Sequence, residues 1–278
     1  MTADLDRPAE AVREVRARRI STCETDPHPV EETVVVVCEA AVIVDVESFG
    51  SFTLLCTPHD RRALAVGFLR SEGVIETLAD IEEMRFCEDD SNCLRVRLSG
   101  KPPVVDDPDR SLLITSSCGA CGTESLVARV AKLPPVGQTL QVTGCLLPAI
   151  RDGLRGRQPM FEACGGTHAV GLFTAEGEII SSAEDAGRHN ALDKAIGRCV
   201  LAGVSTSGLG AAMSGRVSLE MVGKCARAGI EVISAISAPT ALAIDVAENC
   251  GITLCAFVRE SRATVFTHPS RVIGAGKP

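Results

Sequence analysis

Helix patterns and short strand patterns alternate through the second half of this 278-residue chain, and this alternation limits the possible folds more than any other sequence feature. A turn at Glu176-Gly177 predicts a hairpin between strands at Ala169–Thr174 and Glu178–Ser181. The elements expected after it are, in order, helix 188–201, helix Arg216–Ala228 capped by Ser214, strand Ile230–Ile233, helix 237–249, strand Ile252–Val258 and strand Thr264–Thr267. Alternation of this kind is typical of an α/β layer fold.

The first part of the chain is expected to be rich in strands. Residues 1–30 mix charges with prolines and show no stable apolar period, which predicts a flexible lead-in. One helix is expected from Pro58 to Ser71, where apolar side chains recur every four residues. The strands expected around it are Thr33–Cys38, Ala41–Val46, Phe52–Cys56, Ile81–Phe86 and Leu94–Leu98.

A proline-rich stretch separates the two halves of the chain. Residues Gly100 to Pro108 include three prolines, which exclude a helix and predict a linker. Beyond it, short helices are expected at Glu124–Ala131 and Leu146–Leu154. The predicted organisation is a lead-in over 1–30, a β-rich part over 31–110 and an α/β domain over 111–278.

Composition and charge exclude several classes of protein. The chain has 8 Phe and no Tyr or Trp, so its core must be built from Val, Ile, Leu and Ala. A formal net charge of -8 argues against non-specific nucleic-acid binding, which needs a basic surface. The charged N-terminus shows no apolar signal segment, and the longest apolar run, Val34–Val46, is too short for a bilayer, so we expect neither secretion nor a membrane span. The 13 cysteines then fit a reducing cytoplasm.

Residues 116–122, Ser-Ser-Cys-Gly-Ala-Cys-Gly, form the clearest chemical motif. Cys118 and Cys121 lie on one turn, and two thiols at this spacing can share a metal, form a disulfide or relay sulfur. Gly119 and Gly122 leave no side chain beside the sulfurs, so the loop can bend tightly and a bulky partner can approach. A metal knuckle or two unreactive thiols are the alternatives on spacing alone.

A second cluster, Glu184–Lys194, places many ionisable side chains where the predicted hairpin enters a helix. Backbone N–H groups at a helix N-terminus attract anions, and Arg188 and Lys194 add positive charge. Asp185 is expected to accept hydrogen bonds from the edge of a nucleobase. The alternative is a capped, solvated helix start with side-chain pairs four residues apart, such as His189 with Asp193.

Three further segments lie where strands meet loops or helices, which is where open α/β sheets bind their ligands. They are Ser214-Gly215-Arg216, Ser237-Ala238-Pro239-Thr240 and Phe257–Arg262. Two helix starts and several arginines there suggest a pocket for phosphate.

Cys164 and His168 lie just before the predicted hairpin. Together with Cys118 and Cys121 they match the residue types of a Cys₃His zinc site. The long separation of the two pairs is unusual for structural zinc, so zinc is an alternative rather than the prediction. A hydrogen-bonded histidine beside a strand explains His168 equally simply.

Taken together, these segments resemble the FdhD family, the sulfur-carrier proteins required for formate dehydrogenase activity. The resemblance runs in order over roughly residues 30–270, and its motifs are highly specific in combination. Two positions depart from the family pattern: Ala186 replaces a valine, and Glu260 stands where a glycine is expected. The matching segments are Thr57-Pro58, Gly67–Gly73, Cys118–Gly122, Gly165–Ala169, Glu184–Lys194 with Gly197, Ser214-Gly215-Arg216 with Glu220 and Lys224, Ser237–Thr240 and Phe257-Val258-Arg259.

The resemblance implies a cytoplasmic sulfurtransferase with a fold similar to cytidine deaminase, in three layers with a mixed sheet, preceded by the smaller β-rich part. A cysteine desulfurase would load a persulfide on Cys118, with Cys121 as its helper. The chain would bind the molybdenum (or tungsten) bis-molybdopterin guanine dinucleotide cofactor as a client and pass sulfur to it. It would serve formate dehydrogenase and act as a homodimer, with no resident metal.

The cofactor-binding residues follow partly from the resemblance, which singles out the segment near the C-terminus, and partly from the anion sites expected at the strand ends. These residues are His168, Asp185, Arg188, His189, Ser214, Arg216, Ser237, Phe257, Val258, Arg259, Glu260, Ser261 and Arg262.

Three other functions are open on these residues. A zinc nucleobase deaminase needs His-x-Glu and Pro-Cys-x-x-Cys, whereas Ala169 and Val170 follow His168 and no proline precedes Cys118. A non-enzymatic chaperone for the cofactor or the apo-dehydrogenase would use the same anion-binding segments without sulfur chemistry. A thioredoxin-like oxidoreductase is disfavoured because the Cys-x-x-Cys does not lie in an early βαβ unit.

Overall fold

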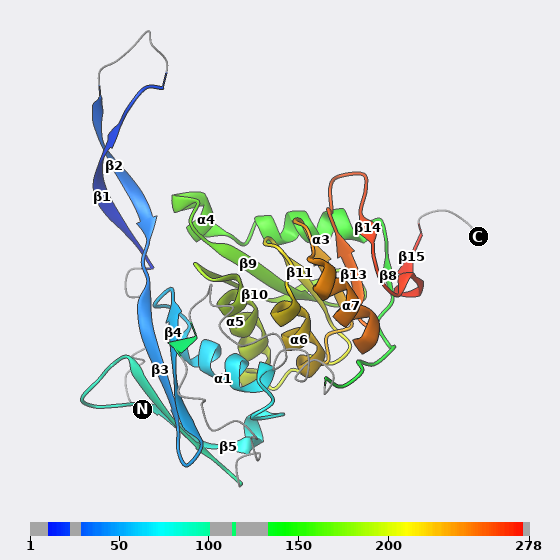
Figure 1. Cartoon of the computed structure of the whole chain (residues 1–278), viewed down its shortest axis with the longest axis horizontal. Helices are drawn as coiled ribbons and strands as arrows, with labels where there is room; N and C mark the ends of the chain where they lie inside the picture. The colour runs from blue at the N-terminus through cyan, green and yellow to red at the C-terminus, as the bar shows by residue number, and fades with distance from the viewer. Residues whose placement is uncertain (1–10, 23–28, 101–112, 115–132, 275–278) are drawn as a thin grey trace.

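The computed structural model describes residues 11–22, 29–100, 113–114 and 133–274 (Figure 1). The Cys-x-x-Cys motif, most of the predicted linker and the helix predicted at Glu124–Ala131 lie outside these residues.

The larger body of the molecule is built on a six-stranded mixed sheet, which confirms the predicted α/β class. Its strands, in their order across the sheet, are β10 (Ile179–Asp185), β9 (His168–Phe173), β11 (Gly210–Met213), β12 (Val232–Ala235), β13 (Thr253–Ala256) and β14 (Thr264–Val265). The three central strands β11, β12 and β13 are parallel, whereas β9 and β14 run antiparallel to them and β10 runs antiparallel to β9.

Helices cover both faces of this sheet and give the body three layers (Figure 1). One face is covered by α3 (Leu146–Arg155), and the other by α5 (Arg188–Leu201), α6 (Leu219–Ala228) and α7 (Ala241–Cys250). Successive residues of β9 serve the two faces, since Phe173 lies in the core under α3 and Leu172 in the core under the other helices. The specific likeness to cytidine deaminase stays a prediction. None of the described helices combines the length and apolar composition needed to span a bilayer.

The N-terminal part forms a five-stranded sheet that shares a core with the larger body. Buried side chains of this sheet contact α1 (Arg61–Ser71), and α1 in turn packs against α5, so one apolar cluster runs through both parts. The predicted boundary near residue 110 lies outside the described residues. The strands, in order, are β5 (Ile81–Phe86), β6 (Cys93–Leu98), β3 (Ala40–Val46), β4 (Gly50–Cys56) and β7 (Leu113–Ile114), and the 3₁₀ helix η1 (Leu78–Asp80) precedes β5.

Helices α1 and α5 cross at two glycines. A Cβ atom on Gly67 would overlap the backbone carbonyl of Asp193, and a Cβ on Gly197 would overlap that of Ala63. Only glycine therefore lets the two helix backbones approach this closely. The crossing fixes the position of α5, and hence of its N-terminal turn, relative to the N-terminal sheet.

A two-stranded ribbon of β1 (Val12–Arg19) and β2 (Val30–Val37) projects from the body (Figure 1). The prediction that residues 1–30 lack regular structure is wrong for 12–19, which pair antiparallel with β2 along their whole length. Nε of Arg18 donates to Oε1 of Glu31 at 2.7 Å across the ribbon. A two-stranded ribbon has no large apolar core to pack against. β1 therefore carries many charged residues and lacks the apolar period on which the prediction relied.

Two helices of the larger body begin about one turn later than predicted, as does α1, which begins at Arg61 rather than at Pro58. The N-cap residue of α6 is Ser218, and Ser214 is not its cap, because Val217 forms a parallel β-bridge that keeps this backbone extended. α7 begins after Thr240, whose hydroxyl accepts a hydrogen bond from the first turn of the helix at 3.2 Å. Both shifts lengthen the loops that follow β11 and β12.

Several short elements were absent from the prediction. β11 is a central, fully buried strand, but its residues Gly-Ala-Ala-Met are small and unbranched, so they lack the composition typical of strands. The other additions are α4 (Pro159–Cys164), β8 (Val142–Thr143), β15 (Val272–Ile273) and the 3₁₀ helix η2 (Pro269–Arg271).

Candidate functional site

The ends of five strands gather at one edge of the six-stranded sheet. Asp185, the last residue of β10, pairs with His168, the first residue of β9. Ser214 follows β11, Ser237 lies in the loop after β12, and Phe257 follows β13 and donates its N–H to the carbonyl of Ser237 at 3.4 Å. These five predicted site residues therefore lie along one edge, in the place where α/β sheets bind ligands.

The N-terminus of α5 lies at this edge beside His168. Gly187 is its N-cap residue and Arg188 its first helical residue. Gly215, in the loop after β11, packs against both neighbours, because a Cβ there would lie 3.1 Å from Nδ1 of His168 and 3.6 Å from Cβ of Arg188. Three segments far apart in the sequence thus meet at one point.

Two guanidinium groups dominate the electrostatics at this point. Burial and the charge of Arg216 lower the pKa of Arg188, and burial together with both arginines lowers the pKa of His168, so the imidazole is neutral at pH 7. Nε of Arg188 is buried and has no hydrogen-bond partner within the part of the chain that the structure describes. Like charges held together with an unpaired buried donor favour an anionic ligand. We call His168, Arg188 and Arg216 the arginine cluster.

Asp185 and Lys194, which the sequence suggested for ligand contact and positive charge, instead join parts of the scaffold. Both are fully buried, and Nζ of Lys194 lies 2.6 Å from Oδ2 of Asp185. Asp185 also accepts hydrogen bonds from the N–H of Thr57 at 3.0 Å, the N–H of Gly187 at 2.8 Å and Nδ2 of Asn190 at 3.0 Å. With both oxygens engaged inside the protein, Asp185 is poorly placed to accept a hydrogen bond from a nucleobase.

Thr57 is a structural residue of the site to which sequence reasoning gave no role. Besides donating to Asp185, it accepts hydrogen bonds from the N–H of Ala186 at its hydroxyl and from Nζ of Lys194 at its carbonyl, both at 3.0 Å. It thereby joins the end of β4 to the start of α5. The only signal in the sequence is its place in a family motif, because a threonine before a proline is not distinctive by itself.

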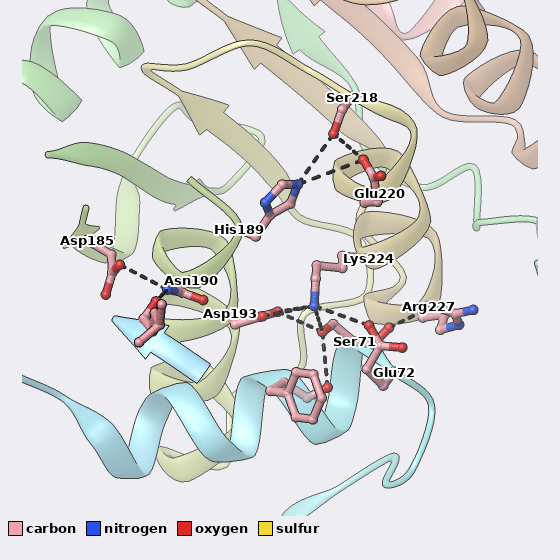
Figure 2. A network of polar contacts seen from close by, with 12 residues as sticks. Ser71, Glu72, Asp185, His189, Asn190, Asp193, Ser218, Glu220, Lys224 and Arg227 are labelled. Carbon is pink, nitrogen blue, oxygen red and sulfur yellow. Dashed lines mark hydrogen bonds and ion pairs between the residues drawn. The ribbon is translucent and has the colours of Figure 1, made fainter. Parts of the chain in front are cut away.

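His189 faces α6. Its Nε2 lies 3.4 Å from Oγ of Ser218 and 3.9 Å from Oε2 of Glu220, and Figure 2 shows the ring pointing toward both. Burial, with the charges of Arg188 and Lys224, lowers the pKa of His189 to about 4. The neutral ring, which directly follows Arg188 in the chain, can therefore accept or donate one hydrogen bond without adding charge to the site.

Asp193, the residue four positions after His189, belongs to a different cluster, so the pair that the alternative interpretation expected between them does not form. Nζ of Lys224 lies 2.9 Å from Oδ2 of Asp193, 2.8 Å from Oγ of Ser71 and 3.4 Å from Oε1 of Glu72 (Figure 2). Burial alone would lower the pKa of Lys224, but the carboxylates of Asp193 and Glu72 raise it. This buried ion pair joins α6 to α1 and α5, and so fixes the position of α6 relative to both helices.

The segment Phe257–Arg262 forms a turn at the same edge. Nη1 of Arg259 donates to the carbonyls of Ile236 at 2.7 Å and Val258 at 2.9 Å, so it clamps this turn to the end of β12. Phe257 has a φ of 53°, which is uncommon for a bulky residue, and its side chain is 41% exposed. The three residues after Arg259 are also exposed, whereas Val258 is buried. The turn therefore offers the exposed ring of Phe257 and the exposed guanidinium of Arg262 at the same edge of the sheet.

Two of the four candidate zinc ligands, Cys118 and Cys121, lie outside the described residues. The Sγ of Cys164, at the end of α4, donates to a backbone carbonyl of the same helix at 3.1 Å. Residues 11–22, 29–100 and 133–274 contain no group of three metal-ligating side chains. The positive charges beside His168 disfavour a second cation there.

The chain matches the FdhD/NarQ family over residues 37–273, a range that includes the arginine cluster and the Cys-x-x-Cys motif. It belongs to this family. A sulfur carrier protein FdhD from Streptomyces coelicolor is 42% identical over 228 residues, which cover 78% of this chain and 81% of the relative. A sulfur carrier protein FdhD from Bordetella bronchiseptica is 35% identical over 272 residues, which cover 96% and 95%. The family predicted from the motifs is therefore confirmed.

A solved structure from Desulfotalea psychrophila, described provisionally as a formate dehydrogenase accessory protein, has a similar fold. The TM-score is 0.74 at 23% identity, and the match covers 95% of this chain and 100% of the other. Because the match covers nearly the whole chain, it supports the overall architecture.

Proposed function

We propose that this chain is a sulfurtransferase that carries persulfide sulfur on Cys118 from a cysteine desulfurase to the molybdenum (or tungsten) bis-molybdopterin guanine dinucleotide cofactor of formate dehydrogenase. Membership of the family, and relatives named sulfur carrier proteins, support the sulfur-carrying part. The accessory role named for the Desulfotalea protein accords with formate dehydrogenase as the destination.

The chemistry requires two exchanges at sulfur. The Cys118 thiolate attacks the terminal sulfur of the desulfurase persulfide, and the desulfurase cysteine leaves as a thiolate. The Cys121 thiolate then attacks Sγ of Cys118, which releases the carried sulfur as hydrosulfide to the metal and leaves a disulfide that a cellular dithiol reduces. Two cysteines on one turn, with glycines beside them, suit both exchanges.

The observation that carries the cofactor part of the proposal is the arginine cluster at the N-terminus of α5. Arg188 and Arg216 supply two positive charges, and Arg188 keeps one buried N–H unpaired among the described residues. A pyrophosphate of the guanine dinucleotide is an anion of the matching chemistry. The exposed Phe257 ring and the turn after it lie along the same edge, where a guanine base can stack.

The first test is mass spectrometry after incubation with a cysteine desulfurase and cysteine. Trypsin releases Ser111–Arg129, a peptide that holds both Cys118 and Cys121. We expect one added sulfur on this peptide in the wild type and in Cys121→Ala, and none in Cys118→Ala. An unmodified wild-type peptide, with the desulfurase shown to load another carrier, would overturn the proposal.

A cofactor chaperone without sulfur chemistry is the second candidate, because the arginine cluster would serve it equally well. The two are separated by the ability of Cys118→Ala to support formate dehydrogenase activation. We expect activation to be lost although guanosine diphosphate still binds. Full activation by this variant would favour the chaperone.

We also propose that the protein acts in the cytoplasm as a homodimer. A reducing compartment keeps unused thiols available for loading, which supports that location. Sedimentation of the purified chain measures its oligomeric state directly, and a monomer at micromolar concentration would contradict the dimer.

A further inference from the structure

The β5–β6 hairpin brings together two cysteines that have no role in the proposed sulfur transfer. Cys87 directly follows β5 and Cys93 begins β6, and the N–H of Cys87 donates to the carbonyl of Cys93 at 2.8 Å. Their Sγ atoms lie 3.0 Å apart, so the two thiols share one hydrogen bond. Both side chains are half-buried, so small molecules can reach them.

This geometry suits a disulfide. Residues directly opposite each other in a hydrogen-bonded pair of antiparallel strands have Cα atoms about 5.5 Å apart, a separation that disulfides span. A disulfide bond is about 2.05 Å long, so the sulfurs must approach by about 1 Å, within reach of small side-chain rotations. No strand has to shift for the bond to form.

The loop between the two cysteines is held in place on both sides. Within it, the N–H of Asn92 donates to Oδ1 of Asp90 at 2.8 Å, and the N–H of Cys93 donates to the Asp90 carbonyl at 3.0 Å. Outside it, Nη1 of Arg61, at the start of α1, donates to the Ser91 carbonyl at 2.7 Å. The two sulfurs therefore meet in an ordered hairpin, so bringing them together for the reaction costs little conformational entropy.

We propose that Cys87 and Cys93 form a redox-active pair that a low-molecular-weight disulfide oxidises to an intramolecular disulfide. The Cys87 thiolate attacks one sulfur of the small disulfide and releases one thiolate. The Cys93 thiol then gives up its proton and attacks Sγ of Cys87, which releases the second thiolate. In balance, the protein dithiol and one small disulfide give the protein disulfide and two small thiols.

The surroundings assign the order of attack. Burial and the hydrogen bond shared with Cys87 raise the pKa of Cys93, which accords with Cys93 as the resolving thiol. The charge of Cys87 also raises the pKa of the exposed Arg95, whose guanidinium contacts Asp45. The acidic residues 88–90 next to the pair repel anionic oxidants, which favours a neutral disulfide as reagent.

Oxidation closes the hairpin covalently. This hairpin contains Ser91, whose carbonyl accepts the hydrogen bond from Arg61 at the start of α1. In a reducing cell such a bond forms only transiently, as regulatory disulfides do. The pair is distinct in sequence from Cys118 and Cys121, so its oxidation can fail or succeed independently of sulfur loading.

The test treats the reduced full-length protein with neutral 2-hydroxyethyl disulfide, followed by acid quench, unfolding, alkylation and trypsin. The peptide Phe86–Arg95 contains only these two cysteines. We expect it to escape alkylation, to be two hydrogens lighter than the dithiol, and to become alkylated twice after reduction. Exposed Cys145 is the internal comparison, and half-conversion of the pair should need about tenfold less reagent than Cys145.

Two variants sharpen the result. Cys93→Ser should trap a hydroxyethyl adduct on Cys87, because the resolving thiol is gone, whereas Cys87→Ser should leave Cys93 open to alkylation. A wild-type peptide that stays fully alkylated, or that carries only mixed adducts, at reagent concentrations that convert Cys145 would overturn the proposal.

Discussion

Helix α5 carries charges in two different settings. Along its length, Lys194 pairs with Asp185, and Asp193 pairs with Lys224, in buried contacts with further hydrogen-bond partners. At its N-terminus, Arg188 lies beside a second arginine and keeps a buried N–H unpaired among the described residues. Buried charges with opposite partners belong to the scaffold, whereas like charges held together mark the place for a ligand.

The largest effect is expected from breaking a scaffold pair. Lys194→Met leaves the Asp185 carboxylate buried without its cation, so the free energy of unfolding should fall by about 3–5 kcal/mol. Urea denaturation measures this change. The matched control is Arg216→Met, an exposed cation at the other setting, which should change stability by less than about 0.5 kcal/mol. Equal losses in both variants would remove the distinction between the two settings.

The second prediction concerns the ligand end of the helix. Arg188→Met should lower affinity for guanosine diphosphate by about tenfold to a hundredfold, since a hydrogen bond to a charged group contributes about 1.5–3 kcal/mol. Isothermal titration calorimetry measures the affinity, with Arg97→Met on the N-terminal sheet as the control. Unchanged affinity in Arg188→Met would place the anion elsewhere.

The third prediction is a pH dependence of stability. His189 has a folded pKa of about 4, below its unfolded value of about 6.5, so the unfolded chain takes up the proton first as pH falls. The stability contribution of the neutral ring is complete above about pH 6.5 and is lost progressively down to about pH 4.

Between about pH 7.5 and about pH 5, the wild type should therefore lose about 2 kcal/mol more than His189→Asn. Urea midpoints at the two pH values measure the difference. The same slope in wild type and His189→Asn would show that this ring is not the titrating group.

The smallest effect is expected at Gly215. A methyl group there would press against the His168 ring, and Gly215→Ala should cost about 1 kcal/mol of stability. It should also shift the imidazole signals of His168 in an NMR spectrum. Gly100→Ala, where the added methyl meets open space, is the control. An unchanged His168 signal would show that the ring does not pack on residue 215.

Much of this arrangement could be predicted from sequence periodicity. The helix Arg188–Leu201 has the predicted bounds, because its apolar residues follow the period of a helix. The strand Ile81–Phe86 also has the predicted bounds, although an irregularity between Ile81 and Glu83 interrupts its alternation. The short strand β11 could not be predicted, since its small residues become strand-forming only when buried between β9 and β12.

The division of charges on α5 could not be predicted either. Asp185, Arg188 and Lys194 share one polar run, and only the packing of Thr57 and α6 around the helix separates scaffold from site. That Ser237 and Phe257 lie at the same end of the sheet was predictable, because the carboxyl ends of neighbouring parallel strands lie together in α/β sheets. The places of Ser214, after the unpredicted β11, and of His168, at the start of the antiparallel strand β9, did not follow from this rule.

The most direct test of sulfur transfer is a single-turnover experiment with labelled persulfide. The chain is loaded with labelled sulfur, the desulfurase is removed, and the bis-molybdopterin guanine dinucleotide cofactor is added and re-isolated. We predict label on the cofactor with the wild type, none with Cys118→Ala, and normal loading but slow transfer with Arg188→Met. Equal labelling of the cofactor by Cys118→Ala would contradict the account.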